Sequence, residues 1–176
     1  MTLFVGGVHA VGKSFILRSV CCDLGLKHAT ASQLIREQRG LESWTTSREV
    51  EDIDKNQQAL IAATRRLEEN GQKVVLDGHF MLRKNVNVHE KIGIDTFVQL
   101  NIRAAILLEA PSEVIASRLR VRGDRTWEIF EIEDFSQKER EHADSVCEQL
   151  GVSLLRLCSP TILEMKCAVE NIFSAH

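Results

Sequence analysis

One short stretch near the amino terminus constrains the fold more than any other part of the chain. Residues 7–14 read Gly-Val-His-Ala-Val-Gly-Lys-Ser, which matches the G-x-x-x-x-G-K-[ST] pattern of a phosphate-binding P-loop. An apolar run at 3–5 precedes the loop and an apolar-faced stretch follows it, so we expect a buried strand, the loop and then a helix. In that arrangement, consecutive backbone N–H groups at a helix N-terminus collect phosphate oxygens.

The residue types in this loop suit a nucleoside triphosphate. Gly7 and Gly12 let the backbone turn inward, Lys13 is expected to reach the β- and γ-phosphates, and the Ser14 hydroxyl is expected to ligate Mg²⁺. The residues predicted to contact the nucleotide are Gly7, Val8, His9, Ala10, Val11, Gly12, Lys13, Ser14 and Phe15.

Strand-like apolar runs alternate with helical stretches, which predicts an α/β fold with a parallel sheet covered on both faces. We expect strands near 2–5, 27–29, 73–76, 104–108 and 153–157. Helices are expected at 13–24, 31–39, 47–71, 96–101, 112–120 with Ser112 as its cap, 127–150 and 162–173. The polar stretch 83–91 is expected to be irregular. Because no linker or repeat divides the sequence, residues 1–176 are expected to form a single domain.

Composition limits the partners and the cellular location that we expect for this protein. A formal net charge of −3 and a pI near 6.1 give no global positive field, so a nucleic-acid partner is not expected. Neither a signal peptide nor a membrane span is evident, and we expect a cytoplasmic protein without a membrane partner. The five cysteines include no C-x-x-C pair, which favours reduced, mostly packed thiols and no zinc site.

Asp77 is the second candidate functional residue. It follows the apolar run 73–76, at the carboxyl end of a predicted strand, where open α/β sheets place their ligand crevice. Its carboxylate would hold Mg²⁺ beside the P-loop, and the alternative is that it caps a turn. His79 could contact the phosphate of an acceptor or could cap the same turn.

Arginines gather at the end of the helix predicted at 112–120. Arg118 and Arg122 share a helix face, with Arg120 between them and Arg125 just beyond a Gly-Asp break. Guanidinium groups on a mobile lid would stabilise the charge of a phosphoryl-transfer transition state and exclude water. The alternative is a solvated, positively charged helix end. Arg140 could reach the same phosphates or lie on the surface among Lys138, Glu139 and Glu141.

In the order of these parts, the chain resembles the P-loop nucleoside monophosphate kinases, and most of all the short archaeal-type adenylate kinases and adenylate-kinase-like proteins. The resemblance spans nearly the whole chain. It rests on the P-loop, Ser32-Gln33-Leu34-Ile35-Arg36, Asp77-Gly78-His79, Arg118-x-x-x-Arg122, and the segment 132–157 with Gln137, Arg140 and Gly151.

The resemblance implies a three-layer P-loop NTPase fold with five parallel strands in the order 2-3-1-4-5, acceptor-binding helices at about 30–70 and a short lid at about 118–127. It implies that ATP and Mg²⁺ are the cofactors and that residues 158–160 lie near the donor base. The implied roles are Mg²⁺ binding for Ser14 and Asp77, acceptor binding for Ser32, Arg36, Arg48 and His79, and transfer catalysis for Lys13, Arg118, Arg122 and Arg140. Two departures, Gly78 and the segment 83–91, leave the acceptor base unassigned.

Three functions fit these observations. The first is ATP- and Mg²⁺-dependent transfer of the γ-phosphoryl group to a nucleoside or deoxynucleoside monophosphate, which needs positioning and charge neutralisation rather than a strong base. The second is a small-molecule kinase that acts on a hydroxyl group and needs a base such as Asp77. The third is a nucleotide-hydrolysing switch or assembly factor, and only this one requires a protein partner.

Overall fold

The apolar runs of the sequence pair into one sheet. The computed structural model describes residues 1–40 and 53–175. Its main sheet contains β1 (Thr2–Gly6), β2 (Lys27–Thr30), β3 (Val74–Asp77), β6 (Ile102–Glu109) and β7 (Ser153–Cys158), in the spatial order β2-β3-β1-β6-β7. All neighbouring strands are parallel. Counted in chain order within this sheet, the arrangement is 2-3-1-4-5, which confirms the predicted fold.

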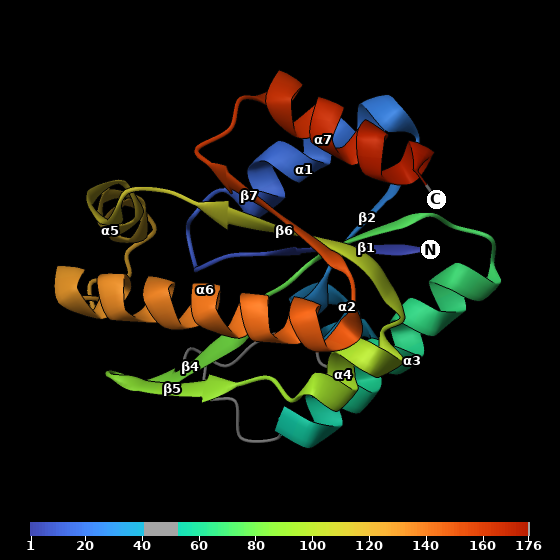
Figure 1. Cartoon of the computed structure of the whole chain (residues 1–176). Helices are drawn as coiled ribbons and strands as arrows, with labels where there is room; N and C mark the ends of the chain where they lie inside the picture. Colours follow the sequence, from blue (N-terminus) through green and yellow to red (C-terminus); the bar gives the residue numbers. More distant parts are fainter. Residues whose placement is uncertain (41–52, 176) are drawn as a thin grey trace.

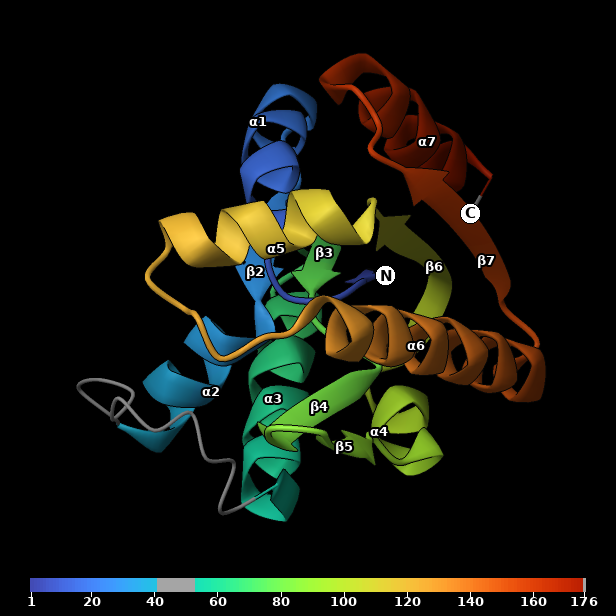
Figure 2. The ribbon, with the colours of Figure 1, turned by 90° about the vertical axis from the view of Figure 1, so that its left-hand side faces the viewer.

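Helices cover both faces of the sheet (Figure 1). On one face lie α1 (Lys13–Leu24) and α7 (Ile162–Ser174). On the other lie α2 (Ala31–Arg39), α3 (Ile53–Glu69), α4 (Ile94–Gln99) and the long α6 (Ile129–Leu150). The helix α5 (Ser112–Val121) lies beside the carboxyl ends of the strands (Figure 2). The start predicted for α3, near residue 47, lies outside the described residues.

Successive side chains of the central strand β1 belong to two different hydrophobic cores, one on each face of the sheet. Leu3 and Val5 of β1 are fully buried and belong to a cluster that includes side chains of α1, α5 and α7. Phe4, between them, belongs to a second cluster, which includes side chains of α2, α3 and α4. Because successive side chains of a strand point to opposite faces, a buried parallel strand reads as a continuous apolar run.

Helix ends are set by local residue chemistry. Gly25 and Gly151 have φ of 64° each and donate their N–H groups back to the last carbonyls of α1 and α6, as the glycine positions predicted. The predicted cap at Ser112 was wrong by one residue. Pro111 occupies the cap position, and Ser112 begins α5 without a side-chain capping bond, because the fixed φ of proline suits the entry to a helix.

The segment expected to be irregular forms an antiparallel hairpin instead. It consists of β4 (Met81–Asn85) and β5 (Val88–Lys91), with Asn87 at a φ of 57° in the turn. Figure 2 shows the hairpin beside α3, α4 and α6. The sequence did not reveal this hairpin because most of its residues are polar. Met81 and Leu82 pack against the two cores, and Arg83 and His89 pair with Glu131 of α6.

None of the helices in the described part of the chain combines the length and the apolar character needed to cross a bilayer.

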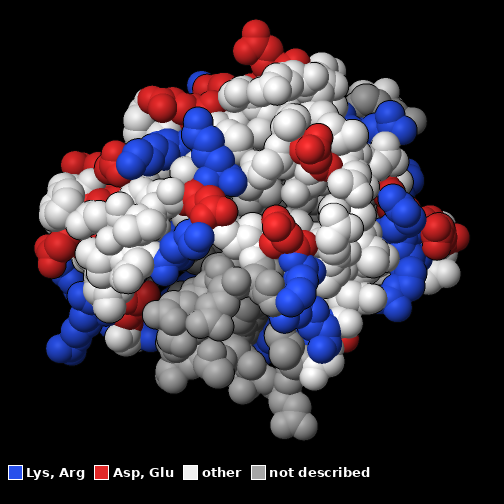
Figure 3. Space-filling model, turned by 90° about the horizontal axis from the view of Figure 1, so that it is seen from below, with Lys and Arg blue, Asp and Glu red and all other residues white. Residues whose placement is uncertain are grey.

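The surface carries charged side chains of both signs and some of the cysteines. On the face shown in Figure 3, Lys and Arg side chains are intermixed with Asp and Glu among the coloured residues. The prediction that the cysteines are mostly packed was wrong. Cys21 and Cys147 are buried, whereas Cys22, Cys158 and Cys167 are exposed, because cysteine is small enough to be placed on either side of an amphipathic helix or edge strand.

Candidate active site

The P-loop leads from β1 into α1 with the strained backbone that its glycines permit. Gly7 and Gly12 have φ of 138° and 116°. A Cβ at Gly7 would lie 2.5 Å from the carbonyl oxygen of Leu108, so both the conformation and the space require glycine. Ala10 is also in the left-handed region, with a φ of 60°. Such local strain is characteristic of ligand-binding loops.

Lys13 is buried within this loop. Its Nζ donates to the carbonyl oxygen of Gly7 at 2.5 Å and lies 3.3 Å from that of Val8. Burial lowers the pKa of the Lys13 ammonium group, the charges of Asp77 and Glu139 oppose that shift, and the positive charge of Arg122 adds to it. Lys13 therefore lies among the charged groups of the site, and its ammonium group is hydrogen-bonded to its own loop.

Asp77 lies directly beside the P-loop. In the sheet register it is the partner of Val5, one residue before the end of β1, and of Thr30 at the end of β2. The Ser14 hydroxyl donates to the Asp77 carboxylate, and Lys13 Nζ lies 3.9 Å from the same group. His28 of β2, which the sequence did not single out, places its Nε2 3.7 Å from Asp77.

The donor set formed by Ser14 and Asp77 suits Mg²⁺, which prefers oxygen ligands and keeps waters and substrate phosphates in its remaining positions. Among residues 1–40 and 53–175, no group of three or more His, Cys, Asp or Glu side chains could hold a metal ion by protein ligands alone. A phosphate-bound Mg²⁺ needs only one or two protein oxygens, so the Ser14 and Asp77 oxygens fit that ion.

One of the arginines predicted to form a lid contacts the P-loop. Nη1 of Arg118, on α5, donates to the carbonyl oxygen of Val11 at 2.6 Å and lies 3.3 Å from that of Ala10. Arg122, at the end of α5, is close enough to Lys13 for its charge to affect the lysine pKa. All four arginines of the cluster, Arg118, Arg120, Arg122 and Arg125, are exposed. The structure therefore brings Arg118 into contact with the predicted phosphate cradle, and it brings Arg122 near enough for its charge to act on Lys13.

Arg140 lies at the same edge of the sheet but is already paired. Its Nε donates to Glu109 Oε1 at 2.6 Å and its Nη1 to Gln137 Oε1 at 2.5 Å. Glu109 ends β6, and its carbonyl oxygen accepts from the N–H of Ser159, the residue that follows β7. Arg140 and the segment 158–160 are thus connected through Glu109.

The structure describes three of the four residues expected to bind the acceptor, namely Ser32, Arg36 and His79. Ser32 and Arg36 stand one turn apart on α2, where Ser32 is exposed and Arg36 is half-buried. The Nε atom of Arg36 is buried and has no hydrogen-bond partner in the described part of the chain. The His79 ring packs against His9 of the P-loop, with ring centroids 4.2 Å apart. Arg48 lies outside the described residues.

Glu139 is the most important residue that the sequence reasoning missed. It was grouped with charged surface neighbours, yet only 1% of it is exposed. Its carboxylate accepts from the N–H of Gly7 at 3.0 Å, of Phe80 at 3.0 Å and of Met81 at 2.6 Å. Helical spacing could have revealed it, because Glu139 stands four residues from Phe135 and four from Ala143, and both are fully buried.

A second missed cluster attaches the hairpin to α6. Arg83 makes two bonds of 2.8 Å to the carboxylate of Glu131, bonds the carbonyl oxygen of Thr126 at 2.8 Å, and places its guanidinium 3.9 Å from the centre of the Trp127 ring. His89 Nε2 lies 3.3 Å from Glu131. The hairpin is thereby tied to the connection between the lid and α6.

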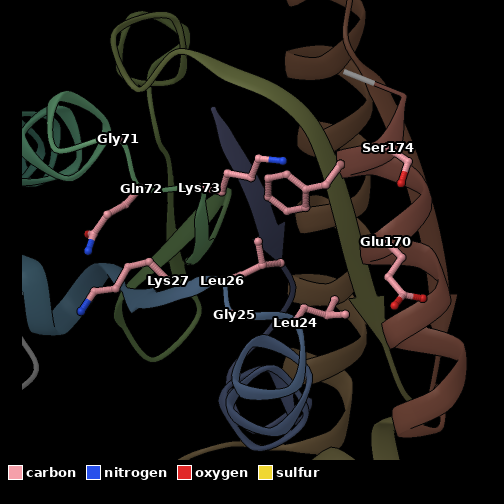
Figure 4. A pocket seen from close by; sticks show the side chains of 10 residues that line it. Leu24, Gly25, Leu26, Lys27, Gly71, Gln72, Lys73, Glu170 and Ser174 are labelled. Atoms are coloured by element: carbon pink, nitrogen blue, oxygen red, sulfur yellow. The ribbon is translucent and has the colours of Figure 1, made fainter.

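A cavity of about 700 Å³ lies at the other end of the sheet (Figure 4). It is lined by Leu26, Lys73 and Phe173 among others, next to the amino ends of β2 and β3. Parallel sheets bind ligands at their carboxyl ends, so the geometry of the P-loop, rather than this cavity, defines the candidate site.

Solved structures with this fold include kinases of small molecules. Shikimate kinase from Aquifex aeolicus has a TM-score of 0.62 and 13% identity, with 99% of this chain and 97% of that chain covered. Shikimate kinase from Acinetobacter baumannii, solved in complex with shikimate, has a TM-score of 0.60 and 14% identity, with 99% and 93% covered. An uncharacterized protein from Eubacterium ventriosum has a TM-score of 0.56 and 7% identity, with 100% and 99% covered.

Sequence comparison gives a complementary result. None of the curated proteins is significantly similar to this chain. The AAA domain family (AAA_17) matches residues 6–134, a segment that contains the P-loop, Asp77 and the lid arginines and that makes up well over half of the chain. With its P-loop kinase fold, the chain therefore belongs to the AAA domain family.

Proposed function

We propose that this protein is a phosphotransferase that moves the γ-phosphoryl group of ATP, in the presence of Mg²⁺, to a nucleoside or deoxynucleoside monophosphate. The observation that carries the proposal is the contact of the lid with the P-loop. Arg118 bonds the loop carbonyls and Arg122 lies near Lys13. Guanidinium groups beside the phosphates stabilise the equatorial charge that develops when the γ-phosphoryl group is transferred, which nucleotide binding alone does not require. Hydrolysis uses the same stabilisation, so the case for an acceptor other than water depends on the residues of the acceptor side.

Each group has a role in this reaction. Ser14 and Asp77 would hold Mg²⁺, which supplies charge neutralisation to the phosphates when bound. Lys13 would leave the Gly7 carbonyl and turn toward the β- and γ-phosphates. Arg118 and Arg122, already at the loop, would contact the transferred group and exclude water from it, so that the acceptor rather than water is phosphorylated.

The engagement of the buried carboxylates favours an acceptor that is already anionic. Both oxygens of Glu139 accept backbone N–H groups, and Asp77 accepts the Ser14 hydroxyl. Glu139 therefore has no oxygen that could take a proton from an acceptor hydroxyl without losing a partner. Asp77 bonds Ser14 through one oxygen and has the other 3.9 Å from Lys13 Nζ, and in this proposal its carboxylate holds Mg²⁺ rather than acting as a base. The buried Nε of Arg36 and the ring of His79 supply donors on the acceptor side, where a monophosphate would bind.

Transfer to a small-molecule hydroxyl is the second candidate, and the structural similarity to two shikimate kinases favours it. In that case Asp77 would receive the hydroxyl proton. The two candidates therefore differ in the role of a single carboxylate.

The experiment that tests the proposal incubates the protein and Mg-ATP with two panels, one of nucleoside and deoxynucleoside monophosphates and one of hydroxy acids and nucleosides, and separates the products. Formation of a diphosphate from at least one monophosphate, absent with a Lys13→Ala control, would support the proposal. Phosphorylation only within the second panel would support the hydroxyl kinase. ATP binding without transfer to any acceptor would contradict both.

A further inference from the structure

The carboxylate of Glu139 joins two segments that are far apart in the sequence. Through Oε1 it bonds the N–H groups of Gly7 and Phe80, and through Oε2 that of Met81. These bonds bridge 132, 59 and 58 positions of the sequence. One side chain of α6 thus fixes the start of the P-loop and the chain just beyond Asp77-Gly78-His79.

The same residue is linked to the phosphate-binding lysine through one peptide. Gly7 donates its N–H to Glu139, while its carbonyl oxygen accepts from Lys13 Nζ. Lys13 must leave that carbonyl to reach a phosphate, and Gly7 then keeps only its bond to Glu139 on this side. The loop would retain its shape during that exchange because the carboxylate, not the lysine, holds its first residue.

A buried carboxylate costs free energy unless hydrogen bonds satisfy it. The carboxylate is 1% exposed, and burial raises the pKa of Glu139 while its three N–H bonds and the charge of Lys13 oppose that shift. An apolar residue at this position of the α6 stripe would pack without that cost, but it would leave three backbone donors without an acceptor.

We propose that Glu139 is a positioning residue, whose buried carboxylate holds the P-loop and the segment after β3 in their nucleotide-binding arrangement before the nucleotide arrives. The inference rests on the proposed binding of ATP by the P-loop, but it does not depend on which acceptor receives the phosphoryl group.

The test compares Glu139→Gln and Glu139→Asp with the matched control Glu141→Gln, an exposed residue two positions along the same helix. Glutamine puts an NH₂ donor where a carboxylate oxygen now accepts an N–H, and aspartate keeps the charge but is one methylene shorter. The affinity for Mg-ATP is measured by calorimetry below the melting temperature of each variant. We expect both Glu139 variants to bind about tenfold or more weakly, since the loss of a hydrogen bond to a charged group is worth about a factor of ten or more in affinity, and Glu141→Gln to bind like the unaltered protein.

A merely structural role would lower the melting temperature and leave the affinity of the folded variants unchanged, and that result would overturn the proposal. Because the measurement is of binding, a failure to find an acceptor leaves it intact. Should neither Glu139 variant fold, hydrogen exchange of the unaltered protein decides. The amides of Gly7, Phe80 and Met81 should be protected both with and without nucleotide, and exchange at the rate of an exposed loop before nucleotide is added would refute the role.

Discussion

The attachment of the β4–β5 hairpin can be tested by replacing Glu131 with Gln. Glu131 is 1% exposed and Arg83 is 12% exposed. The carboxylate accepts two bonds of 2.8 Å from Arg83 and one of 2.7 Å from the N–H of Asn87, with His89 at 3.3 Å. Glutamine keeps one acceptor but removes the charge, so that the guanidinium of Arg83 stays in place without its counter-ion.

The size of the effect follows from this geometry. Removing one partner of a buried ion pair costs about 3–5 kcal/mol, a large part of the stability of a typical domain. At about 2–4 °C per kcal/mol for a chain of this size, the melting temperature should fall by about 6–20 °C. Urea unfolding and calorimetry measure the two quantities. Glu133→Gln is the control, because Glu133 is exposed on the same helix.

A loss in Glu131→Gln below about 1 kcal/mol, no larger than in the control, would refute the reasoning and show that the pair contributes no more than a surface salt bridge. The pH dependence gives a second check. Burial raises the pKa of Glu131, but the bonds from Arg83, Asn87 and His89 outweigh it, and the pKa lies below the ordinary 4.5. The stabilisation is therefore complete above pH 4.5 and is lost as the pH falls through the lowered pKa, so the difference between wild type and variant should shrink in acid.

Three further outcomes are expected. Lys13→Ala and Arg122→Ala should each reduce the turnover of phosphoryl transfer on the order of a thousandfold, and near-normal rates in both would contradict the proposed mechanism. Gly7→Ala should abolish measurable ATP binding in a calorimetric titration, since its Cβ would lie 2.5 Å from a backbone oxygen at a φ of 138°; unchanged affinity would show that the loop can shift. In thiol labelling of the folded protein at pH 8, exposed Cys22 should react while Cys21 does not, because burial raises the pKa of the Cys21 thiol to about 11; equal rates would mean that α1 opens.

Much of the fold could be predicted from the sequence, because its signals are local. A buried parallel strand is a short apolar run between turn residues, and a helix end is often a glycine, so the five strands of the main sheet were expected. Their order was expected from the resemblance to the P-loop nucleoside monophosphate kinases and not from these local signals. The hairpin at Met81–Lys91 was not expected. Its stability depends on Glu131, which is 44 positions or more from its partners Arg83 and Asn87, and no local pattern carries that information.

The candidate site, like the fold, could be predicted only in part from the sequence. The sequence by itself determined the P-loop, the Asp77 carboxylate at a strand end and the arginines near residue 120, because a phosphate cradle requires particular residue types at fixed spacing. Only the tertiary structure decided that Arg118 contacts that cradle, that Arg140 is paired with Glu109, and that Glu139 is buried. The physical reason is that the environment of a charged side chain is set by the chain segments that fold around it, which its own neighbours in the sequence do not specify.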